Sequence, residues 1–100
     1  VVSLDNFNDF YDPAIKRSNI QRLEKYNGFQ SIEGDIRDKA VLDDIFNNNS
    51  FDCVVHLAAM AGVRPSIDDP RLYYDVNING TYNILEKCSE KNSYHFRNVI

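Results

Sequence analysis

Residues 53–66 (CVVHLAAMAGVRPS) constrain the fold of this chain most strongly, because an apolar run leads there into a loop of very small residues. The β-branched and small apolar side chains at its start are typical of a strand buried on both faces of a parallel sheet. The small residues that follow leave room for a flat ligand against the backbone. Open α/β sheets bind ligands at this carboxyl edge of their strands. The stretch therefore predicts a buried strand over residues 51–58 and a cofactor floor in the loop after it.

Strands and helices alternate along the rest of the chain. Further strands are predicted over residues 1–4, 29–33 and 98–100, and helices over 13–26, from 39 onward and over 70–90. Asp12 and Asp38 are expected to cap the first two helices, and Asn27-Gly28 to end the first of them. This alternation predicts an α/β fold with a doubly wound parallel sheet.

The longest predicted helix has an apolar stripe with a small residue in its middle. The stripe consists of Leu72, Val76, Gly80, Ile84 and Cys88, one residue in every four. A glycine inside a helix costs roughly 1 kcal/mol relative to alanine. We therefore expect Gly80 to allow close packing of this helix against the sheet.

Composition argues against several classes of partner. The 100 residues are 43% hydrophobic and 26% charged, and the net charge of −4 offers no basic surface for nucleic acid. The longest mostly apolar run, residues 54–63, is too short to span a membrane. No basic-then-apolar leader opens the chain. Cys53 and Cys88 have no paired-motif spacing, so we expect two reduced, buried thiols in a cytoplasmic protein.

Both ends of the chain lie within apolar runs. The sequence starts with Val1-Val2-Ser3-Leu4, without an initiator methionine, and stops at Val99-Ile100. Because a natural domain rarely begins and ends in the middle of a strand, we expect an internal fragment of a longer protein.

Acidic residues follow the first two predicted strands. Asp5 ends the first strand, and Asp35 comes after the second. In dinucleotide-binding folds, such an acid accepts hydrogen bonds from the adenosine ribose, and its charge disfavours a 2′-phosphate. For either residue alone, a solvated turn aspartate is an equally good interpretation. Together with the small-residue loop, the two acids favour a nucleotide site.

Other polar residues give weaker signals. His56 is expected to be a core histidine with a backbone partner, because no second metal ligand lies near it at metal spacing. Asn79 is expected to be an exposed polar position, and the same interpretation remains open for Asn77. Arg64 either meets a pyrophosphate or sugar carboxylate or lies on the surface. Four cations, Lys16, Arg17, Arg22 and Lys25, are expected to form the solvated face of the first helix.

The chemistry that these residues alone predict is limited. The chain contains no nucleophile–base pair, metal-ligand cluster or paired carboxylates, and no glycine-rich phosphate loop. Taken by spacing alone, the sequence indicates a nucleotide-binding α/β domain without a defined reaction.

Three stretches resemble the extended short-chain dehydrogenase/reductases, and among these the nucleotide-sugar epimerases. They are residues 4–13 (LDNFNDFYDP), 55–66 (VHLAAMAGVRPS) and 73–81 (YYDVNINGT). The first two are most similar to UDP-glucuronate 4-epimerases. The resemblance implies that residues 1–100 form part of a Rossmann-type NAD-binding domain, strands 2 to 5 with the helices between them. The first strand and the C-terminal part of this domain would be missing, and the strand order would be 3-2-1-4-5.

The resemblance also implies which residues contact NAD. They are Asp5, Asn6, Phe7, Asn8, Asp9, Phe10, Asp35, Ile36, Leu57, Ala58, Ala59, Met60, Ala61 and Asn77. Asp5 and Asn6 match the adenosine-ribose contacts, and Asp35 and Ile36 match the pair beside the adenine. Residues 57–61 match the backbone along the pyrophosphate and nicotinamide ribose, and Asn77 matches a helix residue near the nicotinamide. No metal ligand is implied.

By resemblance, the longer protein is an NAD-dependent nucleotide-sugar 4-epimerase, with UDP-glucuronate as the favoured substrate and a homodimeric assembly. NAD would transiently oxidise the sugar at C4. The family's glycine-rich loop would precede Val1, and its catalytic Ser/Thr and Tyr-x-x-x-Lys would follow Ile100, so no catalytic residue is expected in this chain. Two alternatives remain open: a nucleotide-sugar dehydratase or decarboxylase of the same family, and a non-catalytic NAD-sensing protein on the same fold.

Overall fold

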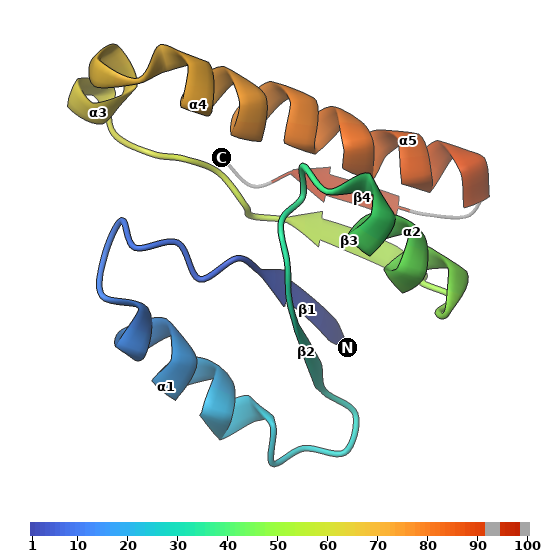
Figure 1. Cartoon of the computed structure of the whole chain (residues 1–100). Helices are drawn as coiled ribbons and strands as arrows, with labels where there is room; N and C mark the ends of the chain where they lie inside the picture. Colours follow the sequence, from blue (N-terminus) through green and yellow to red (C-terminus); the bar gives the residue numbers. More distant parts are fainter. Residues whose placement is uncertain (92–94, 99–100) are drawn as a thin grey trace. The chain divides into compact units, whose positions relative to one another are not determined.

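The computed structural model describes residues 1–91 and 95–98, which divide into two units, residues 1–35 and 36–100. Each unit contains one pair of parallel strands, β1 with β2 and β3 with β4 (Figure 1). Both pairs are neighbours in the expected strand order. The alternation of strands and helices and the parallel pairing confirm the predicted α/β class.

The first unit is a single strand–helix–strand unit. It consists of β1 (Val2–Asp5), α1 (Pro13–Leu23) and β2 (Gln30–Glu33). In the strand register Val2 pairs with Gln30 and Asp5 with Glu33, so both strands end at the same level. The loops that follow them therefore begin side by side.

Helix α1 begins as predicted but ends earlier. The Asp12 side chain accepts a hydrogen bond from the Ala14 N–H at 3.0 Å, and Pro13 occupies the first helical turn. The predicted end at Asn27-Gly28 is wrong, because the helix ends at Leu23. The Tyr26 N–H bonds to the Leu23 carbonyl at 3.0 Å, which continues the chain in turns instead of α-helix.

In the second unit, three consecutive helical segments over residues 70–91 form one long helical rod beside the strand pair (Figure 1). Its elements are α2 (Lys39–Asn47), β3 (Cys53–His56), α3 (Val63–Asp68), α4 (Pro70–Tyr74), the π-helix η1 (Asp75–Gly80), α5 (Thr81–Lys91) and β4 (His95–Asn98). The single helix predicted over residues 70–90 is thus interrupted by a π-helical segment. Helix α3, in the predicted loop, was not expected. Of the strand predicted over 98–100, residues 99 and 100 lie outside the described residues.

The core of the second unit forms where α2 packs against α5. Asp38 caps α2 as predicted, and its carboxylate accepts from the Ala40 N–H at 3.0 Å. Leu42, Ile45 and Phe46 are buried on the inner face of α2. The predicted stripe is confirmed: Val76, Gly80, Ile84 and Cys88 are buried, and Leu72 is half-buried.

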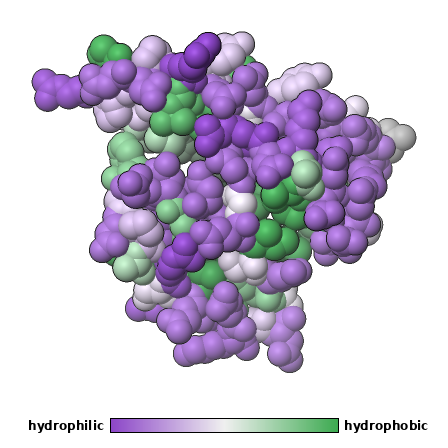
Figure 2. Space-filling view, in the orientation of Figure 1, coloured by the Kyte–Doolittle hydropathy of each residue, from purple (hydrophilic) through white to green (hydrophobic). Residues whose placement is uncertain are grey.

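Strand β3 is less buried than predicted. Val55 is 58% exposed, and Leu57 just after the strand is 66% exposed. Cys53 is also exposed, which corrects the prediction of two buried cysteines, although both are free. Exposed residues alternate along β3 with more buried ones, Cys53 and Val55 with Val54 and His56, so one face of the strand is exposed and the other is covered. Apolar side chains reach an otherwise polar surface in several places (Figure 2).

In the part of the chain that the structure describes, no helix is both long and apolar enough to cross a membrane.

Gly80 is packed closely, but against Ile36 rather than against the sheet. A Cβ at position 80 would lie 2.5 Å from Ile36 Cδ1. We expect Gly80→Ala to destabilise the protein by about 1 kcal/mol, because overpacking of up to about 3 kcal/mol outweighs the roughly 1 kcal/mol gained in helix propensity. Chemical denaturation of the full-length protein measures this change.

Gly28→Ala is the matched control, because nothing lies within 4 Å of a Cβ at that position. Its effect should stay within about 0.5 kcal/mol. Combining Gly80→Ala with Ile36→Ala should cost less than the sum of the two single changes, since the clashing atoms are gone. Strict additivity would contradict the proposed clash.

Candidate functional site

The loop after β1 is ordered by its own side chains. Three side-chain oxygens each accept the backbone N–H two residues further on: Asp5 Oδ1 from Phe7 at 2.8 Å, Asn6 Oδ1 from Asn8 at 3.0 Å and Asn8 Oδ1 from Phe10 at 2.8 Å. Asn and Asp form such turns readily, because their short side chains reach that N–H. The side chains of the D-N-F-N sequence therefore contribute directly to the order of this loop.

The first of these turns fixes the Asp5 carboxylate at the carboxyl end of the strand pair. Phe7 adopts a φ of 50°, a left-handed conformation that is uncommon for a residue with a large side chain. Its N–H holds Asp5 Oδ1, whereas Oδ2 accepts no hydrogen bond among residues 1–91 and 95–98. One carboxylate oxygen thus builds the loop, and the other remains available to a ligand.

The loops after β1 and β2 are joined by a side-chain hydrogen bond. Asn6 Nδ2 donates to Asp35 Oδ2 at 3.2 Å. The two predicted acids, Asp5 and Asp35, therefore follow neighbouring strands, as the sequence indicated. Asp9 and Phe10 lie further out in the loop and are exposed. This unit brings the predicted residues 5–10 and 35 together at one edge.

Two cations of α1 are not simply solvated, which corrects the prediction for this helix. Arg17 donates to both carboxylate oxygens of Glu33, at 2.9 and 3.2 Å, and its guanidinium carbon lies 4.3 Å from the centre of the Phe7 ring. Lys16 donates to the Asn8 carbonyl at 2.7 Å. Both cations therefore contact the ordered loop or its neighbours.

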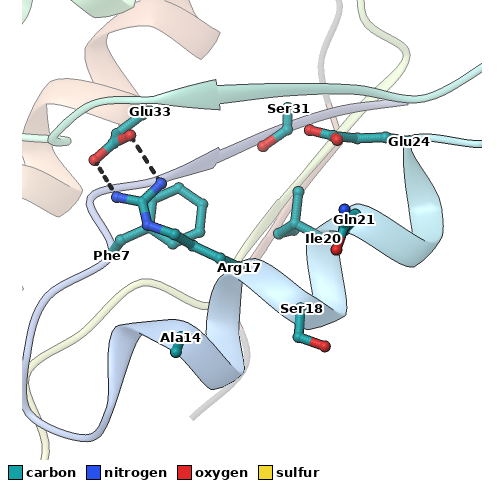
Figure 3. Close-up of a pocket in the computed structure, with 9 residues that line it drawn as sticks. All are labelled: Phe7, Ala14, Arg17, Ser18, Ile20, Gln21, Glu24, Ser31 and Glu33. Carbon is teal, nitrogen blue, oxygen red and sulfur yellow. Dashed lines mark hydrogen bonds and ion pairs between the residues drawn. The ribbon is translucent and has the colours of Figure 1, made fainter.

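Arg17 and Glu33 also border an open groove of about 570 Å³ in the first unit (Figure 3). The groove is lined by Phe7, Ala14, Arg17, Ser18, Ile20, Gln21, Glu24, Ser31 and Glu33. No residue of α1 is buried, so the helix covers this face of the strand pair incompletely.

In the second unit, Asn77 holds the backbone of the predicted cofactor floor. Its Nδ2 donates to the Met60 carbonyl at 3.0 Å, and its Oδ1 accepts from the Met60 N–H at 2.8 Å. Asn77 lies in the π-helical segment, and such segments are frequent at functional sites. Asn79 is exposed as expected and bonds to Asp75 at 3.0 Å. The two asparagines therefore have different structural roles.

The same rod holds a second loop. Ile36 is buried against Gly80, and its carbonyl accepts from Asn83 Nδ2 at 3.1 Å. Tyr73 Oη donates to the Ala61 carbonyl at 2.6 Å. Residues 36 and 60–61, which follow different strands, are thus both fixed to one helical rod. The sequence analysis did not predict roles for Tyr73 and Asn83. For Asn83 the available signal was its position next to Ile84 of the apolar stripe.

The remaining floor residues, Leu57, Ala58 and Ala59, are exposed. Arg64 is exposed as well and lies on α3. Ala58 and Ala59 have small side chains, and whether they form a ligand floor stays a prediction.

His56 is a core histidine, as predicted, but its partner differs. It is 4% exposed, and its Nε2 lies 2.8 Å from the Thr81 hydroxyl oxygen rather than from a backbone group. Burial lowers the pKa of the imidazole below its usual 6.5. Among residues 1–91 and 95–98, no cluster of three or more potential metal ligands occurs. His56 is therefore a neutral structural residue at pH 7.

The depressed pKa of His56 predicts a pH-dependent stability. The unfolded state binds more protons than the folded state between the folded pKa and 6.5, so the contribution is complete above 6.5 and is lost as the pH falls below it. We therefore expect the free energy of unfolding to fall as the pH is lowered through 6.5. His56→Gln, which cannot titrate, should show a shallower slope, whereas equal slopes would contradict the assignment.

Comparisons with known proteins agree on one group. The chain matches the family model described as GDP-mannose 4,6 dehydratase over residues 2–99. It is 47% identical over 92 residues to UDP-glucuronate 4-epimerase 3 of Arabidopsis thaliana, which covers 92% of this chain and 21% of that protein. It is 43% identical over 86 residues to UDP-glucuronate 4-epimerase of Thermodesulfobacterium geofontis, covering 86% and 27%. The chain thus spans well under a third of the length of these relatives.

Solved structures show the same architecture. UDP-glucose 4-epimerase from Bifidobacterium longum, in complex with NAD+ and UDP, superimposes with a TM-score of 0.76 at 28% identity, covering 96% of this chain and 28% of that one. A dTDP-glucose 4,6-dehydratase from Streptomyces venezuelae, with NAD and TYD bound, gives a TM-score of 0.78 at 25% identity, covering 93% and 27%. The fold is therefore a partial Rossmann fold, as predicted.

Proposed function

Because the chain belongs to the GDP-mannose 4,6 dehydratase family, we propose that it forms part of the NAD-binding domain of a nucleotide-sugar 4-epimerase acting on UDP-glucuronate. The observation that carries this proposal is the 47% identity over 92 residues to a UDP-glucuronate 4-epimerase. Strands β1 to β4 would be strands 2 to 5 of that domain. The rest of the domain and the sugar-binding part would lie elsewhere in the protein.

The residues present fit a dinucleotide. Asp5 offers a carboxylate oxygen at the end of β1, where a ribose hydroxyl donates in dinucleotide-binding folds. Asn6 and Asp35 lie beside it, and Phe7, Asn8, Asp9 and Phe10 complete the loop. Ile36 would contribute its backbone, because its side chain is buried against Gly80. In the second unit, Leu57, Ala58, Ala59, Met60 and Ala61 would line the cofactor, and Asn77 would hold Met60 in place.

NAD, when bound, would supply the hydride acceptor and donor for a transient oxidation at C4 of the sugar. The residues of this chain would bind the adenosine half of NAD and line the remainder of the cofactor. Because the cofactor must be regenerated in each turnover, they also have to retain it and keep water away. We assign no acid or base to this chain.

A dehydratase is the second candidate, favoured by the family description and by the dTDP-glucose 4,6-dehydratase neighbour. Incubation of the full-length protein with UDP-glucuronate, followed by NMR of the product, separates the two. The C4 epimer without net NADH supports the epimerase, and loss of water supports the dehydratase. An absent Tyr-x-x-x-Lys after Ile100, with NAD bound but no turnover, would instead support a sensor.

We further propose that the protein is a homodimer. Tyr74, Ile78, Tyr82 and Leu85 recur every three or four residues along α4, η1 and α5, and all four are exposed. An apolar stripe of this kind is typical of a protein interface. Light scattering of the full-length protein should give twice the monomer mass, and a monomer at micromolar concentration would contradict the proposal.

We propose a cytoplasmic location because the two cysteines, Cys53 and Cys88, are free thiols. Exposed thiols such as Cys53 persist in reducing compartments. Fractionation of cells expressing the full-length protein tests this.

A further inference from the structure

An ion pair between Arg17 and Glu33 joins α1 to β2 in the first unit (Figure 3). Arg17 donates to Glu33 through both terminal nitrogens, at 2.9 and 3.2 Å. Its guanidinium carbon lies over the Phe7 ring, 4.3 Å from the ring centre. A bidentate carboxylate and a cation–π contact thus fix this cation in one orientation.

Both partners of this cation, Glu33 and Phe7, are in turn neighbours of the Asp5 carboxylate proposed to bind the ribose. Asp5 and Glu33 are register partners on neighbouring parallel strands, whose backbones lie about 4.8 Å apart. Phe7, on which Arg17 stacks, donates its N–H to Asp5 Oδ1 at 2.8 Å. Two carboxylates and one guanidinium therefore share the carboxyl end of β1 and β2. The charge of Arg17 offsets the repulsion expected between paired acids.

We propose that Glu33 acts together with Asp5 in selecting NAD over NADP, by occupying the Arg17 guanidinium that a 2′-phosphate would otherwise recruit. The inference rests on the NAD binding proposed above. Guanidinium groups bind phosphates through two parallel hydrogen bonds, and arginine near this ribose is the usual means of accommodating NADP. With one N–H of each terminal nitrogen donated to Glu33 and its charge offset by that carboxylate, Arg17 attracts a 2′-phosphate less strongly than a free guanidinium would.

Neutralising Glu33 should release Arg17 without unfolding the protein. The side chains of Arg17 and Glu33 are 55% and 56% exposed, and exposed ion pairs contribute little to stability. The hydrogen bond from Arg17 lowers the pKa of the Glu33 carboxyl, so this group is charged at neutral pH. Glu33→Gln therefore removes a full negative charge and leaves a side chain of the same size.

The test measures NAD and NADP binding to the cofactor-free, full-length protein by isothermal titration calorimetry. Glu33→Gln should raise the affinity for NADP relative to NAD by about tenfold, the value of one charge-assisted hydrogen bond. This gain should shrink at high salt, because ions screen the released cation. The double variant Glu33→Gln/Arg17→Met should lose the gain entirely.

Glu24→Gln is the matched control, since Glu24 is an exposed acid that lines the same groove. Its cofactor preference should equal that of the unmodified protein. If Glu33→Gln behaves like this control, or if its gain persists without Arg17, the role of Glu33 is overturned while NAD binding stands. If the unmodified protein binds neither dinucleotide, the proposed function fails as well.

Discussion

Replacing Asp5 with serine should weaken NAD binding and shift the preference toward NADP by about 10- to 100-fold, the range expected for a hydrogen bond to a charged group. The carboxylate lies at the end of β1 with Oδ2 available, and its charge repels a 2′-phosphate. Removing it abolishes both effects. Calorimetric titration of the cofactor-free, full-length protein with NAD and NADP measures the shift.

Asp5→Asn is the informative companion to this change. Its side-chain oxygen can still accept the Phe7 N–H, so the turn that orders the loop persists while the charge is lost. A shift in both variants assigns the effect to charge, and a shift in serine alone assigns it to loop order. Unchanged discrimination in both would remove Asp5 from the site.

Asn77→Ala should lower NAD retention by at least about tenfold. The change removes two hydrogen bonds to Met60, and each unsatisfied backbone group costs about 1–3 kcal/mol when buried. The floor loop should therefore open more often. The measurements are the NAD content of the purified full-length protein and the hydrogen exchange of the Met60 amide, which reports loop opening directly.

Asn79→Ala provides the control on the same helical segment. Asn79 is exposed and makes a bond to Asp75, so its loss should barely change NAD content or exchange at Met60. Equal effects of the two alanine variants, or the reverse order, would contradict the role assigned to Asn77.

Features that depend on neighbouring residues could be predicted from the sequence. Asp12 and Asp38 cap their helices because a short carboxylate reaches the first free N–H groups. The apolar stripe on the rod is buried because its period matches the helix. That Asp5 and Asp35 each follow a strand is also a local feature, whereas the pairing of those two strands is not.

Features that join distant parts of the chain were decided by tertiary structure. The sequence around Asn77 is compatible with an exposed polar side chain and with one that hydrogen-bonds to a distant backbone. Its bonds to Met60, 17 residues away, decide between the two. The π-helical segment and the approach of Gly80 to Ile36 depend in the same way on a partner far along the chain. The pattern of the first helix predicts that Arg17 is solvated, but in the folded unit Arg17 on α1 hydrogen-bonds to Glu33 on β2. Local sequence thus determined the elements and their caps, whereas contacts between distant residues determined which polar side chains hold the candidate site.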